Sequence, residues 1–209
     1  MIEFYFRKGN KVNKLRIKDL VLGQMDGIHP ILFLLMVLLG YICLQLIWLL
    51  RSKYMGIHIP LNYKLGRIFY LIYLCFIFQI TLCNRETGSR DSISIIPFLN
   101  IYHWTGELNE SRLLYALLNC LLFVPYGFII SFLKSHYRWE LMLLLVTSKS
   151  FLLSALIEIT QLITSRGYFE TEDLICNTAG GILGSILFLM FVYVFPKIRL
   201  KTDVKGELF

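Results

Sequence analysis

The sequence predicts an all-α protein: a multi-pass transmembrane helical bundle of about five spans, with an interfacial or re-entrant segment between the second and third. Of its 209 residues, 56% are hydrophobic and only 17% are charged, and the mean hydropathy is +0.63. A soluble domain is nearer to half apolar and a quarter charged. Several uncharged runs approach the roughly 20 residues needed to cross a hydrocarbon core. Together these observations predict an integral, multi-pass protein of the cell membrane.

The predicted spans follow one another without a long linker or an internal repeat. They cover about Ile31–Leu50, Ile68–Cys83, Leu113–Leu133, Leu141–Thr164 and Leu174–Phe195. Arg51 follows the first span and Pro196 stops the last, while the second span is the shortest. Residues 31–195 are therefore expected to form a single bundle between a basic N-terminal flank (1–30) and a basic C-terminal tail (196–209).

The segment from Ile93 to Trp104 is apolar and aromatic but too short to cross a bilayer, which predicts an interfacial or re-entrant position. Tyr102 and Trp104 are typical of a belt at the level of the lipid headgroups. This segment lies between the second and third spans.

The formal net charge of +7 arises largely in the two flanks, as expected for contacts with anionic lipid headgroups. Basic residues do not interleave with aromatic residues on a polar surface, so no nucleic-acid partner is predicted. The five cysteines show no CxxC spacing, and neither a disulfide framework, a metal site nor another cofactor is predicted. Ten Lys and Arg residues fall on each side of the bundle, so charge alone leaves the orientation open.

The fourth span carries a polar stripe at helical spacing, which must face the bundle or a water-filled cavity. Its members are Thr147, Ser150, Ser154, Glu158, Gln161 and Ser165. The hydroxyl residues are expected to form ordinary hydrogen bonds between helices. Glu158 is a candidate functional residue, because placing a carboxylate inside a membrane only to pack two helices is energetically unfavourable. Lys149 lies on the opposite face of the same helix and is not its partner.

Further polar residues flank this stripe on the neighbouring spans and loops. Arg166 follows the fourth span, as a boundary anchor or as a ligand for a carboxylate or phosphate, and Arg85 and Arg90 are alternative cations. Three acids, Glu170, Glu172 and Asp173, follow Arg166; a solvated acidic loop is favoured over a cation site, and Asp173 is placed to cap the fifth span.

The third and fifth spans carry residues that bear on how the helices pack. In the third, Pro125 predicts a kink and Gly127 loosens the same region, while Asn119 is placed to bond Glu158 or Asn177 if the helices meet. In the fifth, the polar and small residues Asp173, Asn177, Gly180, Gly181 and Gly184 fall on one face. Gly180 and Gly184 predict close packing against another helix.

Three motifs in this order resemble the VanZ-like family of bacterial membrane proteins over residues 90–184. They are I-S-I-I-P-F, N-C-L-L-F-V-P-Y-G and the string E-x-x-Q…R…D-L-x-x-N-x-x-G-G-x-x-G. The resemblance implies that the family residues are Pro97, Phe98, Asn119, Phe123, Pro125, Gly127, Glu158, Gln161, Arg166, Asp173, Asn177, Gly180, Gly181 and Gly184. Ser94, Glu170 and Glu172 depart from the family pattern, where Asn and two aspartates are expected.

The resemblance implies a role in low-level resistance to the glycopeptide teicoplanin, and an arrangement in which the Pro97–Phe98 and Arg166–Asp173 loops share the outer side. The leading hypothesis is a polar site that recognises a lipid-linked or cell-wall component, with membrane lipids as the surrounding partners. A membrane-embedded enzyme with Glu158 or Asp173 as general acid or base is the alternative. It is disfavoured because no nucleophile–base pair is recognisable, and a small transporter or flippase is disfavoured because no repeat is visible.

Overall fold

The computed structural model describes residues 22–23, 28–56, 61–83, 93–94, 96–98, 109–167 and 169–195. Within these ranges, five helices are long and apolar enough to cross a membrane. They are α2 (Pro30–Met55), α3 (Leu61–Phe78), α4 (Glu110–Leu133), α5 (Trp139–Ile163) and α6 (Thr171–Val194). The π-helical turn η1 (Gln79–Cys83) extends α3. The all-α, multi-pass prediction is confirmed.

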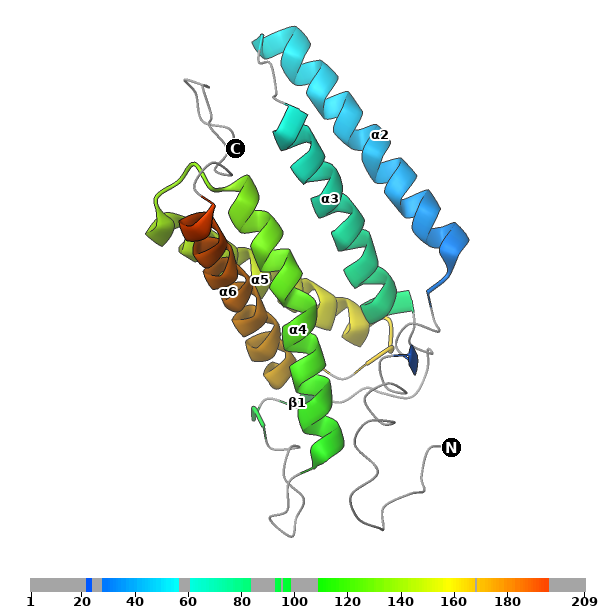
Figure 1. Cartoon of the computed structure of the whole chain (residues 1–209). Helices are drawn as coiled ribbons and strands as arrows, with labels where there is room; N and C mark the ends of the chain where they lie inside the picture. The colour runs from blue at the N-terminus through cyan, green and yellow to red at the C-terminus, as the bar shows by residue number, and fades with distance from the viewer. Residues whose placement is uncertain are drawn as a thin grey trace.

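Helices α4, α5 and α6 form the packed part of the bundle, α3 lies against α4, and α2 lies along the outer side of α3 (Figure 1). The core between α3, α4 and α5 contains Phe123, Tyr126, Val146 and Ile157, all with at most 2% of their surface exposed. Most of α2 is exposed and apolar, which suits a helix whose outer face meets lipid.

Helices α4 and α6 approach each other through glycines. A Cβ atom at Gly180 would collide with the carbonyl oxygen of Cys120, and one at Gly184 would collide with that of Val124. This is the close approach that the spacing of the two glycines predicts, because only a residue without a side chain lets two backbones meet.

The proline of α4 lies inside a continuous helix. The hydroxyl of Tyr73 donates to the carbonyl of Leu122, in the turn before Pro125, where the proline weakens the backbone ladder (2.7 Å). The loosening of this region that the sequence suggested stays a prediction, but a Cβ at Gly127 would collide with the carbonyl oxygen of Gly181. Its role is contact with α6.

All five helices begin between one and seven residues before the predicted spans. Helix α3 starts at Leu61, seven residues before the predicted Ile68. Its first two turns carry polar side chains at the membrane boundary, and Arg67 donates to the Tyr63 hydroxyl there (2.8 Å). Helix α6 starts at Thr171, with acids in its first turn that interact favourably with the helix dipole. Its N-cap residue is Glu170 rather than Asp173, and the Glu170 side chain makes no capping hydrogen bond.

A short parallel pair of strands joins the two loops that the family resemblance placed together. Strand β1 (Ile93–Ser94) pairs with β2 (Phe169–Glu170), with Ser94 opposite Glu170. The sequence predicted no strand here, because two residues carry no periodic signal. The rest of the predicted interfacial segment, including Tyr102 and Trp104, lies outside the described residues.

Candidate functional site

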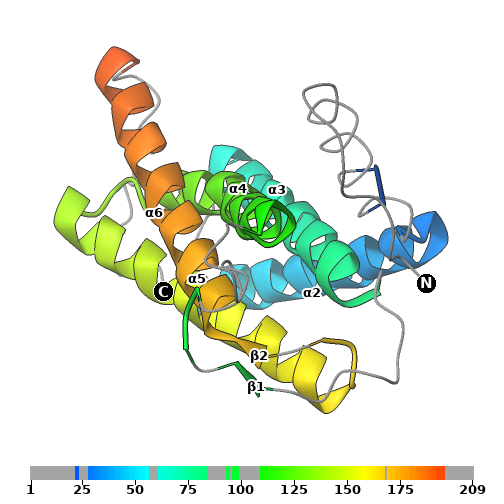
Figure 2. The same cartoon turned by 90° about the horizontal axis from the view of Figure 1, so that it is seen from below.

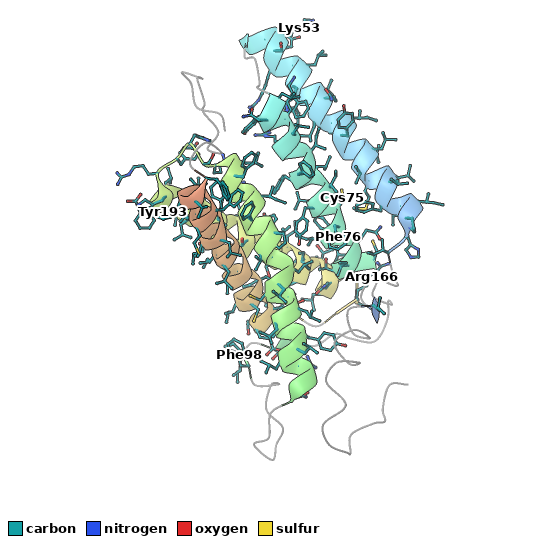
Figure 3. The ribbon with its side chains drawn as sticks, in the orientation of Figure 1. Lys53, Cys75, Phe76, Phe98, Arg166 and Tyr193 are labelled. Atoms are coloured by element: carbon teal, nitrogen blue, oxygen red, sulfur yellow. The ribbon has the colours of Figure 1, made fainter. Side chains whose placement is uncertain are left out.

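Several segments meet at one end of the bundle: the end of α5, the turn η1, the β1–β2 pair and the first turn of α6. Seen from that end, β1 and β2 lie beside α5 and the start of α6 (Figure 2). Arg166 and Phe98 lie toward this end, whereas Lys53 lies at the opposite end of the molecule (Figure 3). These segments carry most of the polar residues that the sequence singled out.

Helix α5 ends in a Schellman motif that fixes the position of Arg166. Ser165 has a positive φ of 53°. Its N–H donates to the Leu162 carbonyl (3.1 Å), and the Arg166 N–H donates to the Gln161 carbonyl (2.8 Å). These are the two backbone bonds that define the motif. The chain therefore reverses within two residues, and the Arg166 side chain leaves the helix toward α3.

Gln161 and Arg166 bind the carbonyl groups at the end of α3. The Gln161 amide donates to the Thr81 carbonyl (2.9 Å), and the Arg166 guanidinium donates to the Leu82 carbonyl (2.7 Å). Carbonyls in the last turn of a helix have no partner within that helix, and a cation there also interacts favourably with the helix dipole. Arg166 thus caps η1 and makes no ion pair with Glu158.

Three buried polar atoms near η1 have no hydrogen-bond partner among the described residues. They are Gln79 Nε2, Gln161 Oε1 and Arg166 Nε. Gln79 is fully buried, and its Oε1 accepts from the His29 backbone N–H (3.1 Å). Two donors and one acceptor left unmatched in one place give this end of the bundle spare hydrogen-bonding capacity. The sequence prediction did not include Gln79, which is one of several glutamines in apolar runs.

Glu158 lies at the junction of α5 and α6, and only 2% of its surface is exposed. Its Oε2 accepts from the backbone N–H of Glu170, the N-cap residue of α6 (3.1 Å). A carboxylate placed at the N-terminus of a helix is stabilised by the free N–H groups and the dipole there. This contact explains how an acid is tolerated near the end of a membrane-crossing helix.

Glu172 connects α6 to the Pro97–Phe98 turn. Its Oε2 accepts from the Phe98 N–H (3.1 Å), and only 4% of its surface is exposed. Phe98 has a positive φ of 64°, an uncommon conformation for a bulky residue. Thr171 adds a hydrogen bond from its hydroxyl to the Ser94 carbonyl (3.3 Å). The turn is held in a strained conformation by contacts from α6, as happens at functional sites.

Arg112 is a site residue that the sequence prediction missed. Its Nη1 lies 2.6 Å from Oε1 of Glu170, whose side chain is 13% exposed. Arg112 lies in the first turn of α4, where Asn109 accepts from its N–H (3.3 Å). A cation at a helix N-terminus interacts unfavourably with the helix dipole. The position of Arg112 in the sequence therefore indicated that its side chain pairs with an acid elsewhere in the chain.

Asp173 lies at this end, in the first turn of α6, whereas Asn177 and Asn119 lie farther along their helices. Asn177 is buried nearly two turns into α6, and its amide donates to the Ser154 hydroxyl (2.8 Å). Asn119 is half-buried and forms no hydrogen bond to Glu158 or Asn177 in the described structure. The expectation of that bond was wrong, because Cys120 faces Gly180 across the helix contact and its neighbour Asn119 is rotated away. Arg85 and Arg90 lie outside the described residues.

Besides the polar end, the outer face of α5 and α6 carries an apolar groove of about 300 Å³. It is lined by Phe151, Leu174, Ile175, Thr178, Ala179 and Ile182. On α6 these residues follow Thr171 on the same helical face, so the groove begins about one turn from the polar end. Within the described ranges, no three His, Cys, Asp or Glu side chains are grouped so that they could hold a metal ion.

Comparison with known proteins relates the chain to one described family. The sequence model of the family VanZ/LLP1 matches residues 67–192, which is more than half of the chain and extends the predicted resemblance on both sides. No curated protein and no solved structure matches the chain.

Proposed function

The chain belongs to the VanZ/LLP1 family, and we propose that this integral membrane protein recognises a lipid-linked or cell-wall component of the bacterial envelope. Binding would occur at the polar end of the bundle and would lower susceptibility to teicoplanin. The protein would then act by holding or masking an envelope component.

The observation that carries this proposal is the convergence of charged side chains from three helices at one end of the bundle. The backbone N–H of Glu170 donates to the Glu158 carboxylate, and the Glu170 carboxylate is paired with Arg112. Arg166 reaches the same end and keeps one buried N–H without a partner in the described structure. Carboxylates and arginines together suit the hydroxyl, amide and phosphate groups of such a component.

The apolar groove supports the lipid-linked form of the ligand. A lipid-linked component has a polar head and a hydrocarbon chain, and the groove on α5 and α6 begins about one turn from Thr171. We propose that the first part of the hydrocarbon chain lies in this groove while the head lies at the polar end. The continuity of the groove with the polar residues of α6 is the reason for this assignment.

Teicoplanin susceptibility of a Gram-positive host expressing the protein tests the proposal. Glu158→Gln and Arg112→Gln are expected to return susceptibility to the level of a host carrying the empty vector, because each removes a charge at the polar end. Ala179→Phe is expected to do the same by filling the groove.

The matched control is Glu140→Gln, which removes an exposed acid near the start of α5, where it pairs with Arg138 (3.1 Å). Susceptibility should match that of the unchanged protein at equal amounts of membrane-inserted protein, measured by immunoblot. Equal susceptibility of the Glu158 and Glu140 variants would rule out the polar end as the site.

The burial of Glu158 favours a second candidate, an enzyme that acts on a membrane-embedded substrate. A carboxylic acid shielded from water can serve as a general acid or base. This candidate predicts turnover of a lipid-linked substrate by the purified protein, abolished by Glu158→Gln. Binding without turnover would leave recognition as the function.

A further inference from the structure

Lys149 takes no part in the candidate site. It lies in α5, ten residues after Trp139, so it is about 15 Å along the helix from the boundary. The Tyr126 hydroxyl donates to its backbone carbonyl (3.4 Å), and its side chain is exposed. A lysine that faces lipid extends its hydrocarbon stem toward the nearest polar boundary. For Lys149 that boundary is the end of the bundle opposite the candidate site.

Arg67 in α3 and Lys134, the C-cap residue of α4, are among the other cations at this opposite end. The Arg67 guanidinium of α3 lies 4.9 Å from the ring centre of Tyr63 and donates to its hydroxyl (2.8 Å). Tyr63 packs against Leu133, the residue before Lys134, at the end of α4. Arg67 and Lys134 are thus brought together by the packing of α3 on α4.

The positive charges of Lys149 and Arg67 both act on Lys134. Burial, and after it the charges of Lys149 and Arg67, lowers the pKa of Lys134. Within the described residues no acid pairs with any of the three, since the ion pairs found there join Arg112 to Glu170 and Arg138 to Glu140. Like charges that lie near one another repel unless an anion joins them.

We propose that Arg67, Lys134 and Lys149 form a binding site for a phosphate group at the end of the bundle opposite the polar site. The planar guanidinium of Arg67 suits two oxygens of a phosphate, and each lysine supplies a point charge. The phosphate comes either from the headgroup of an anionic lipid or from a soluble phosphate compound. This site is independent of the proposed recognition of an envelope component.

Equilibrium binding of a fluorescent phosphatidic acid to the full-length protein in phosphatidylcholine nanodiscs tests the proposal. Lys149→Gln and Lys134→Gln are each expected to weaken binding about fivefold, as estimated for one lysine at an anionic surface. Lys149→Arg should retain binding, because it keeps the charge. The matched control is Lys53→Gln, which removes an exposed cation near the end of α2 whose ammonium lies 5.6 Å from the Tyr54 ring centre.

A loss in the Lys149 and Lys134 variants but not in the Lys53 variant would support a defined site. Equal loss in all three would show diffuse attraction to the bilayer and overturn the proposal, as would unchanged binding in all of them. Competition by inorganic phosphate identifies the source of the ligand: displacement points to a soluble phosphate compound, and persistence of binding points to the lipid headgroup.

Discussion

At the scale of the residue, Ser165 has a left-handed backbone conformation that is unfavourable for a residue with a side chain. It occupies the left-handed position of a Schellman motif, which is usually glycine. Replacing Ser165 with Gly is expected to stabilise the protein by about 1 kcal/mol, because a left-handed conformation costs an L-residue about that much. Thermal unfolding of the purified protein in detergent measures the change.

Thr164→Gly is the control for this substitution. Thr164 is the C-cap residue of the same helix and has a negative φ of −87°. Glycine there should lower the unfolding temperature, because it adds backbone freedom without relieving strain. If both glycine variants shift the temperature in the same direction, the strain assigned to Ser165 is not the cause.

At the scale of the element, the contact between α4 and α6 depends on the absence of side chains. Gly180→Ala is expected to destabilise the protein by about 1 to 3 kcal/mol, the usual cost of overpacking, because the new methyl group would meet the Cys120 carbonyl. Ala179→Val adds bulk one residue earlier, on the exposed face of α6, and should leave stability nearly unchanged. Unfolding of both variants in detergent distinguishes this contact from a general intolerance of α6.

The helices could be predicted because hydropathy and length act locally along the chain. The spacing of Gly180 and Gly184 likewise indicated a close contact. The partners of Gln161 and Arg166 could not be predicted, since they are backbone carbonyls of η1, about 80 residues away in sequence. The same holds for Arg112, whose partner Glu170 lies in β2, although the unfavourable position of Arg112 at the start of α4 indicated that it has a distant partner.

At the scale of the whole molecule, the two ends of the bundle differ in the sign of the charge carried by the residues that the structure describes. The end with β1 holds most of the buried acids, and the other end holds Arg67, Lys134 and Lys149. Positive residues favour the cytoplasmic side of a membrane. Because ten Lys and Arg residues fall on each side of the bundle, this rule leaves the orientation open, and the outer position of the Pro97–Phe98 turn stays a proposal that rests on the family resemblance.

Cysteine labelling of intact cells tests that orientation. In a variant lacking the five native cysteines, Ile96→Cys is expected to react with a membrane-impermeant maleimide, whereas Arg138→Cys should react only after the cells are opened. Both positions are exposed, Ile96 at 62% and the Arg138 side chain at 86%, so accessibility within the fold does not bias the comparison. Labelling of Arg138→Cys alone in intact cells would reverse the proposed topology.

The pairing of β1 with β2 also sets an order on synthesis. Ser94 pairs with Glu170, 76 positions later, so the strand that precedes the Pro97–Phe98 turn must wait for its partner. At about 5 to 20 residues per second, translation takes roughly 4 to 15 s to cover that interval. During this time α4 and α5 enter the membrane while the turn lacks the Glu172 contact that holds it. The polar end of the bundle is therefore completed only when the start of the last helix has been made.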